Sequence, residues 1–150
     1  MSTSSPPAAV QQVAAALAGL GAAGTPVPGP PHPLPDGQSA VRTHVFEAAG
    51  KPLVVVCAGH PDPVDLAGVL GAETVRRVPP PVATLWTGQD PGSVAPVGHA
   101  EPVIVVIDIN LAQPVVLWVP AGAPGYAFPT TYSELLRITA GIAAEVGKLP

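Results

Sequence analysis

Residues 88–99 constrain the fold most, because their sequence GQDPGSVAPVGH places glycine and proline at close spacing between two apolar regions. Glycine reaches positive φ and lets another backbone approach closely, whereas proline fixes φ and removes an amide donor. A mixture of the two residue types holds the main chain to one path. The segment therefore predicts a shaped loop, of a kind suited to a binding site.

The segments around this loop predict a mixed α/β fold. Residues 64–72 predict a helix that Asp62 or Asp65 can cap and that Gly71 ends. Residues 41–47 alternate and residues 53–58 are continuously apolar, so with the turn between them they predict a β-hairpin. Two further strands are expected, paired side by side, at 103–108 and 115–119.

The N-terminal part predicts one helix and one irregular connection. Residues 8–20 are rich in alanine with leucine, valine and glutamine, and the glycines that follow end the helix. Residues 1–7 are expected to be disordered. Residues 24–38 are rich in proline and glycine, which predicts a surface connection without regular structure.

Short elements complete the predicted order. A strand is expected at 74–78 and a helical turn at 82–87, after three consecutive prolines. The last helix begins at Thr131 or Ser133. Its predicted buried stripe consists of Leu135, Leu136, Ile138, Ile142 and Val146. We therefore expect a mixed sheet flanked by helices.

Length and composition limit the class of protein. A chain of 150 residues predicts one domain, residues 1–150, and a content of 47% hydrophobic but 4% aromatic residues predicts an aliphatic core. The apolar runs are shorter than the roughly 20 residues that cross a bilayer, so no membrane partner is expected. The N-terminus lacks a secretion signal and a single cysteine makes no internal disulfide, so the expected location is cytoplasmic. A net charge of -4 argues against DNA and other broad nucleic-acid binding, and leaves room for a local basic patch.

Three short motifs resemble a dinucleotide-binding site, a zinc site and a serine nucleophile, but the sequence around each does not favour that function. Residues 19–24 match the dinucleotide fingerprint, but they follow a helix and are interpreted as a helix stop. Cys57 lies near His60 without the second ligand pair of a zinc site, so we predict a buried strand cysteine and no metal. Ser93 lacks the elbow sequence of serine hydrolases. No cofactor is predicted.

Three single residues have both a functional and a structural interpretation. His99 ends the loop and titrates near neutrality, as a catalytic acid or base does, and the alternative is an exposed loop histidine. Arg42 begins a strand, where its guanidinium either holds a phosphate or carboxylate or is simply solvated. Asp108 ends an apolar strand, and capping of a turn is favoured over a role in a site.

In this order the segments resemble the YbaK family, the aminoacyl-tRNA deacylase domain also found inserted in bacterial prolyl-tRNA synthetases. The similarity runs from about residue 41 to 146 and includes the hairpin, Leu70-Gly71-Ala72, the glycine loop and Val106-Ile107-Asp108. The resemblance implies a curved mixed sheet flanked by helices and removal of wrong amino acids from tRNA, in several members from tRNA for proline. It implies a catalytic role for Arg42 at the 3′ acceptor end. Gly88, Gly92, Ser93 and Gly98 match the family loop, which implies that they position the substrate. Pro96, His99 and Asp108 are further candidate substrate-binding residues.

The chain departs from the family pattern at three places. It reads Val41-Arg42-Thr43 where members typically carry Val-Lys-Thr, which keeps the charge and changes its shape. It reads Tyr126-Ala127-Phe128 after Gly125, where many relatives have an acidic residue. Proline-rich residues 26–35 replace a stretch that is often helical in relatives and helps to cover the pocket.

Three functions compete on this basis. The leading hypothesis is a trans-editing hydrolase that deacylates mischarged aminoacyl-tRNA, with Arg42 holding the 3′ end and the loop holding the ester. The second is a noncatalytic family member that binds aminoacyl-tRNA, a nucleotide or a small amino-acid derivative. The third is an interaction module whose proline-rich segment occupies a partner groove. The sequence predicts no particular oligomeric state.

Overall fold

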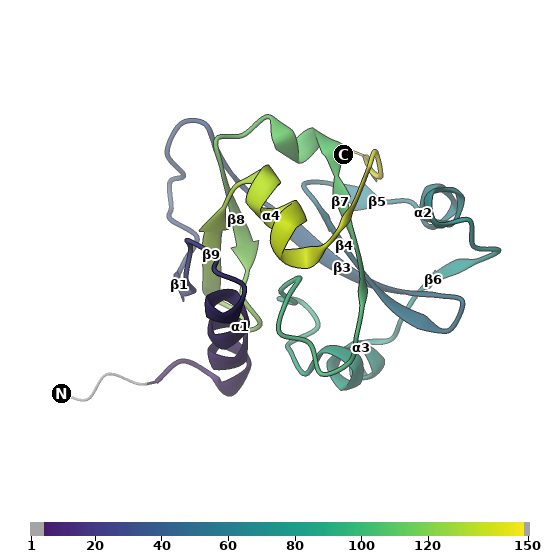
Figure 1. Ribbon diagram of the computed structural model, residues 1–150, viewed down its shortest axis with the longest axis horizontal. Coiled ribbons are helices and arrows are strands. Elements are labelled where there is room, and N and C mark those ends of the chain that lie inside the picture. Colours follow the sequence, from purple (N-terminus) through teal and green to yellow (C-terminus); the bar gives the residue numbers. More distant parts are fainter. Residues whose placement is uncertain (1–4, 149–150) are drawn as a thin grey trace.

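The computed structural model describes residues 5–148, which form two mixed β-sheets, a two-stranded ribbon and four α-helices (Figure 1). The larger sheet has the order β10 (Ile142–Ala144), β7 (Ile104–Asp108), β4 (Lys51–Cys57), β3 (Arg42–Ala48) and β6 (Val75–Arg77). The second sheet has the order β1 (Val27–Pro28), β9 (Tyr126–Thr130), β8 (Val116–Pro120) and β2 (Gln38–Ala40). The ribbon pairs β5 (His60–Pro61) with β11 (Gly147–Lys148). The predicted α/β class with a mixed sheet and flanking helices is confirmed, and the sheet is divided in two.

The predicted hairpin is β3 and β4, which pair antiparallel from Arg42↔Cys57 to Ala48↔Lys51. Strand β4 also pairs in parallel with β7, so it has a neighbour on each side. Its residues from Leu53 to Cys57 are completely buried, because both faces of this central strand are covered. That position explains the continuous apolar run in the sequence.

The predicted pairing of residues 115–119 with residues 103–108 is wrong. After β7 the 3₁₀-helix η1 (Ile109–Ala112) carries the chain to the second sheet, where β8 pairs with β9 and β2. Strand β7 pairs instead with β4 and β10, both in parallel. Apolar alternation identifies a strand but not its partner, since both sheets offer a covered face.

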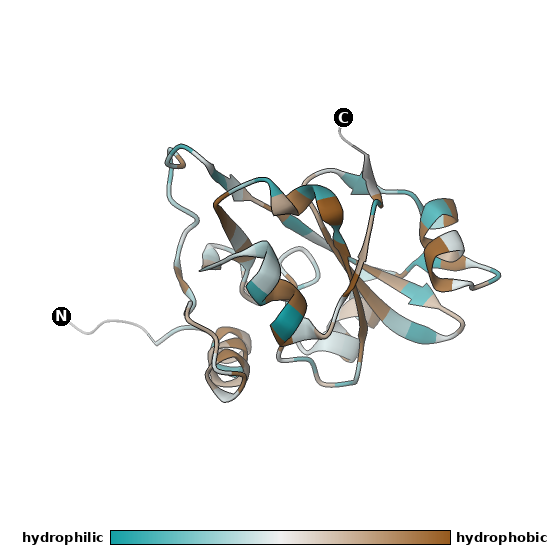
Figure 2. Cartoon of the chain, turned by 45° about the horizontal axis from the view of Figure 1, so that its top comes forward, coloured by the Kyte–Doolittle hydropathy of each residue, from teal (hydrophilic) through white to brown (hydrophobic). Residues whose placement is uncertain are grey.

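The larger sheet buries both of its faces, in two separate cores. One face carries Val56, Val105 and Ile107, which pack against the second sheet, α1 (Ala8–Gly19) and α4 (Tyr132–Thr139). We call it the loop face, because Ala95 and Val97 of the 88–99 loop join the same core. The opposite face carries Phe46, Val55 and Cys57 and packs against Leu66 of α2 (Pro63–Leu70), so we call it the α2 face. Figure 2 shows apolar residues concentrated along the central strands.

Two internal helices begin and end at residues that explain their length. Helix α2 begins after Asp62, whose carboxylate accepts a hydrogen bond from Val64 N at 2.8 Å, and ends at Gly71 with φ 65°. Helix α3 (Pro80–Thr87) begins two residues before the predicted turn at 82–87. Proline is favourable in the first helical turn, where its missing N–H has no partner to lose. Pro79 thus precedes the helix and Pro80 and Pro81 form its first turn, where a break in the chain was predicted.

The predicted C-terminal helix is too long. Helix α4 ends at Thr139, because Ala140 adopts φ 50° and turns the chain. Ile142 lies in β10 and Val146 packs on the α2 face, so neither belongs to the predicted helical stripe. Gly141 permits this turn, since a Cβ there would lie 2.7 Å from Thr139 Oγ1 and 3.0 Å from Ile107 Cδ1. The close approach lets β10 pair with β7.

The proline-rich connection at 24–38 is not wholly irregular. Val27 and Pro28 pair antiparallel with Ala127 and Tyr126 of β9, and β2 begins at Gln38. These two residues form an edge strand, where proline is tolerated. They are therefore already paired within the chain.

The N-terminal helix begins at Ala8, as predicted, and ends at Gly19, one residue earlier than the predicted range. The expected disorder of residues 1–7 falls partly on residues 1–4, which lie outside the described part of the chain. Just before α1, the Pro6 carbonyl accepts a hydrogen bond from Gln11 Nε2 at 2.7 Å. Between residues 5 and 148, no helix is both long and apolar enough to cross a membrane.

Candidate functional site

The 88–99 loop is organised by one buried side chain, Gln89, which is 2% exposed. Its Nε2 donates to Val97 O at 2.9 Å and to Gly98 O at 3.2 Å, and its Oε1 accepts from Ala95 N at 2.7 Å. These bonds cross the loop and fix its path. Sequence reasoning missed Gln89, because glutamine is mostly a surface residue. The only signal was its position directly after the helix-ending Gly88.

Several backbone amides of the loop are already hydrogen-bonded within the protein. Gly92 N donates to Asp90 Oδ1 at 2.9 Å, and Ser93 N donates to Asp90 O at 3.0 Å. Gly122, in the turn between β8 and β9, accepts from Asp90 N and donates to Ser93 O. These groups hold the loop in place. The N–H groups of Gly92 and Ser93 therefore do not form a ready-made oxyanion hole.

Two glycines of the loop have structural explanations. Gly88 has φ 72° and ends α3 in the left-handed conformation. Gly98 has φ 77°, and a Cβ there would lie 3.2 Å from Val13 Cα of α1. Pro96, which lies between the two glycines in the sequence, is buried. The loop is thus packed closely against the N-terminal helix.

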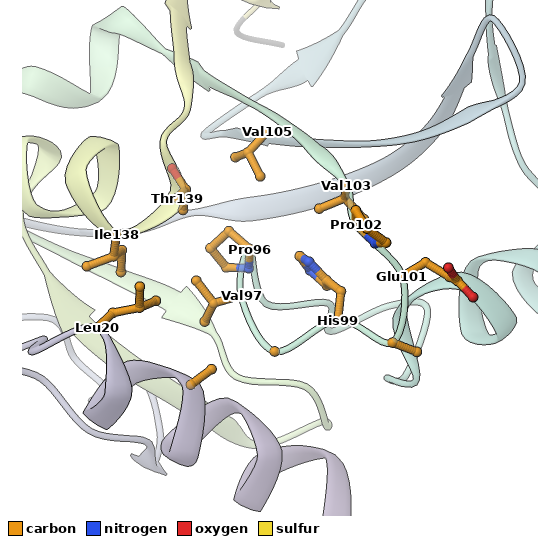
Figure 3. A pocket seen from close by; sticks show the side chains of 13 residues that line it. Leu20, Pro96, Val97, His99, Glu101, Pro102, Val103, Val105, Ile138 and Thr139 are labelled. Carbon is orange, nitrogen blue, oxygen red and sulfur yellow. The ribbon is translucent and has the colours of Figure 1, made fainter.

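His99 lies half-buried at the end of the loop, with Nε2 bonded to the Ala95 carbonyl. Burial lowers the pKa of His99, and the bond to Ala95 opposes this only in part. The ring is neutral at pH 7, and Nε2 carries the proton because a carbonyl only accepts. His99 borders a cavity of about 440 Å³ between α1, α4, β7 and the loop; Figure 3 shows its ring near Pro96 and Val103.

Arg42 lies on the other side of the sheet from this loop. The hydroxyl of Thr43 donates to Val94 O of the loop, so Thr43 points to the loop face. Side chains of neighbouring residues in a strand point to opposite faces, so Arg42 lies on the α2 face, the same face as its β4 partner Cys57. The sequence predicts that Arg42 holds the 3′ end and the loop holds the ester, which would place the two together, but the structure puts them on opposite faces of the sheet. Val41, which points away from Arg42, belongs to the loop-face core.

Asp108 and Cys57 lie with Arg42 at one edge of the α2 face, at the carboxyl ends of β7 and β4. Asp108 is 2% exposed, and its Oδ1 accepts from Asn110 N at 3.2 Å and Asn110 Nδ2 at 3.1 Å. It therefore caps η1, as the favoured interpretation predicted. Asp108 also borders a cavity of about 300 Å³ that includes Ser39, Ala58 and Gln113. Carboxyl ends of parallel strands are common ligand sites.

Cys57 is completely buried, and its Sγ donates to Gly59 O at 3.2 Å. Burial first and the charge of Asp108 second raise the pKa of the thiol to about 11. Cys57 is therefore a thiol and not a nucleophilic thiolate at neutral pH. The interpretation as a buried strand cysteine is confirmed.

The two faces meet at one open edge of β3. Strand β6 pairs only with residues 46–48 of β3, so the edge from Arg42 to Val45 has no strand beside it. A cavity of about 160 Å³ follows this edge, and its lining includes Thr43, His44 and Arg77 together with Pro91 of the loop. Arg42 and the loop approach this edge from opposite sides. Residues 5–148 contain no cluster of three or more potential metal ligands.

Comparison with known proteins identifies the family of the chain. The family model of the aminoacyl-tRNA editing domain matches residues 9–138. A structure described as a candidate trans-editing enzyme for prolyl-tRNA synthetase is 23% identical, with 96% of this chain and 99% of that chain covered and a TM-score of 0.84. A structure from a study of computational epitope grafting onto scaffold proteins is 21% identical, with 95% and 99% covered and a TM-score of 0.83. A hypothetical protein is 18% identical, with 91% and 99% covered and a TM-score of 0.76.

No curated protein matches the chain significantly in sequence. The solved structures are less than 25% identical and establish the fold, whereas the family model spans most of the sequence. The match includes the loop, both faces of β3 and the carboxyl ends of β4 and β7. The chain belongs to the aminoacyl-tRNA editing domain family, as the resemblance in its sequence predicted.

Proposed function

We propose that this protein hydrolyses the ester bond of mischarged aminoacyl-tRNA as a trans-editing hydrolase. The observation that carries the proposal is the family match over residues 9–138. Mischarged tRNA for proline is the first substrate to test, because a structure similar in fold is described as a candidate trans-editing enzyme for prolyl-tRNA synthetase.

The chemistry we propose is direct attack by water. Cys57 is a buried thiol with a pKa of about 11, so it supplies no nucleophile at pH 7. Within residues 5–148 the Ser93 hydroxyl has no hydrogen bond to a histidine, so it lacks the activating base of a serine hydrolase. Catalysis then rests on positioning the ester and stabilising the charge that develops on its carbonyl oxygen.

In this proposal the open edge of β3 holds the reacting ester. Arg42 approaches the edge from the α2 face, where its guanidinium can hold a phosphate of the 3′ end or the developing oxyanion. Asp108 lies two strands away, at the end of β7, and borders a separate cavity, so its role in substrate binding stays a prediction. The loop approaches from the other side through Pro91, and Gly92 and Ser93, which follow it directly, are proposed to position the aminoacyl group. A role in substrate binding for Gly88, Pro96, Gly98 and His99 stays a prediction, because the last three border the separate cavity beside α1 and α4.

The test is a deacylation assay over a panel of mischarged tRNAs, comparing the natural protein with Arg42→Ala. We expect a loss of about 10- to 1,000-fold, as for removal of one transition-state interaction. The side chain of Arg42 is exposed and forms no hydrogen bond or ion pair within residues 5–148, so folding should stay intact by circular dichroism. Arg76→Ala is the matched control, because Arg76 is exposed and lies on the opposite face. Unchanged turnover in Arg42→Ala on every responsive substrate would contradict the role of Arg42.

A noncatalytic binding protein is the second candidate. Two observations favour it: the Gly92 and Ser93 amides are engaged within the loop, and Asp108 is engaged as a cap. Because these amides and this carboxylate are already hydrogen-bonded within the protein, fewer polar groups are left for catalysis. Binding of aminoacyl-tRNA without turnover on any member of the panel would support this candidate and contradict the hydrolase. Arg42→Lys refines the outcome, since raised turnover would mark the natural arginine as a weakened form of the site.

A further inference from the structure

The α2 face gathers arginine and histidine side chains in a chain whose net charge is -4 and whose lysines and arginines number only 6. Arg42 and His44 alternate along β3 on this face, and Arg77 of β6 joins them because it pairs with Phe46. His60 completes the group, with its ring centroid 6.1 Å from that of His44. We call Arg42, His44, His60 and Arg77 the basic strip.

The two arginines of the basic strip have no acidic partner. Within residues 5–148, neither Arg42 nor Arg77 forms an ion pair or a side-chain hydrogen bond. By contrast, Arg76 lies 3.3 Å from Glu47 on the other face, and Arg137 pairs with Glu134. The guanidinium of Arg77 lies 5.0 Å from the centre of the Phe46 ring. Such a cation–π contact holds the group in place while its N–H donors stay available.

The surroundings of His44 indicate a positive potential. Burial lowers the pKa of His44 most, and the charges that lower it further belong to Arg77, His60 and Arg42. The Gly59 backbone opposes the shift, and no carboxylate contributes. His44 Nε2 is buried without a hydrogen-bond partner. The neutral ring can donate through Nε2 only when that nitrogen carries the proton, so the positive charge available to an anion on this surface is that of Arg42 and Arg77.

The length of the strip fits a short run of nucleic-acid backbone. Four residues separate Arg42 from Phe46, the partner of Arg77, which corresponds to about 13 Å along a β-strand. Stacked nucleotides rise about 3.4 Å each, so the strip spans roughly four of them. That is the length of the unpaired 3′ end of a tRNA. Arginine is well suited to such contacts, because its planar fork matches phosphate oxygens.

We propose that the basic strip binds successive phosphates of the single-stranded 3′ end of tRNA, with Arg42 at the ester end and Arg77 at the end nearer the acceptor stem. The proposal deepens the proposed function and rests on tRNA being the substrate. Phosphate contacts carry no base information, so this binding tolerates changes of nucleotide sequence. Sequence specificity, where present, belongs to other contacts.

The test measures binding of an uncharged single-stranded RNA with a tRNA 3′ sequence, by fluorescence anisotropy over a range of salt concentrations. We expect Arg77→Gln to weaken binding about 5- to 20-fold and to reduce the salt slope by about 0.7, the value for one lost contact on a single strand. Arg76→Gln is the matched control, with the same charge change one residue away on the opposite face. It should change the affinity by less than about twofold.

Two results would overturn the proposal. Equal weakening in Arg76→Gln and Arg77→Gln would indicate a general charge effect, and no weakening in Arg77→Gln would exclude the strip. Loss of the contact between Arg77 and Phe46 is another way in which Arg77→Gln would weaken binding. Two variants separate this cause from loss of charge: Arg77→Lys keeps the charge, and His60→Ala leaves the contact with Phe46 intact. Arg77→Lys should retain most of the affinity and His60→Ala should reduce it; the reverse pattern would also refute the strip. RNA binding without turnover would overturn the hydrolase alone.

Discussion

Gln89 offers a sharp test of how the loop is built. Replacing it with alanine removes the donor to Val97 O and Gly98 O and the acceptor for Ala95 N. Val97 and Ala95 are buried, so their freed groups find little water. Each unsatisfied buried group costs about 1–3 kcal/mol, which gives roughly 3–5 kcal/mol for Gln89→Ala after partial relaxation at Gly98. That is a large share of the about 5–15 kcal/mol that stabilises a typical domain.

The measurement is urea unfolding followed by tryptophan fluorescence and circular dichroism. Gln89→Glu keeps the shape and the acceptor for Ala95 N, but it turns a carboxylate toward two carbonyl oxygens. It should therefore destabilise at least as much as alanine at pH 7 and less at pH 4, where a protonated carboxyl can donate. Gln113→Ala, at an exposed glutamine, should cost less than about 0.5 kcal/mol. A loss below 1 kcal/mol in Gln89→Ala would refute the assignment.

Two further predictions concern stability. The pKa of Cys57 is raised from 9.0 to about 11, so its stabilising contribution is complete below pH 9 and is lost as pH rises toward 11; the natural protein should lose roughly 2 kcal/mol more than Cys57→Ala between pH 8 and 10.5, and parallel alkaline profiles would contradict this. Ala140 ends α4 with φ 50°, a conformation that glycine adopts without steric cost. Ala140→Gly should therefore raise the unfolding free energy by about 0.5–1 kcal/mol in urea, whereas a decrease would show that chain entropy outweighs the relieved strain.

Local signals in the sequence predicted the local structure well. Asp62 and Gly71 mark the ends of α2 because capping and left-handed termination depend on the residue itself. The β3–β4 hairpin follows from alternation and a turn that is adjacent in sequence. The loop was predicted from its glycines and prolines, but the only sequence signal for Gln89, which fixes the loop, is its position directly after the helix-ending Gly88.

Features that depend on distant segments were not predictable. The end of α4 is set by Gly141 approaching Ile107 of β7, a contact that helical periodicity does not contain. The partner of β8 depends on where η1 leads the chain. The face of Arg42 was ambiguous for the same reason, because alternation separates Arg42 from Thr43 without saying which of the two faces the loop.

The open edge of β3 reconciles these placements with the proposed function. Its two sides are joined by Thr43, which bonds the loop, and by His44, which lies in the basic strip; both border the same cavity as Pro91. If the tRNA 3′ end lies along the strip, its terminal ester arrives at the start of β3, where β6 no longer covers the strand. An ester at that position meets Arg42 from one face and the loop from the other. Division of the site between two faces is then a consequence of binding the end of a strand across the edge of a sheet.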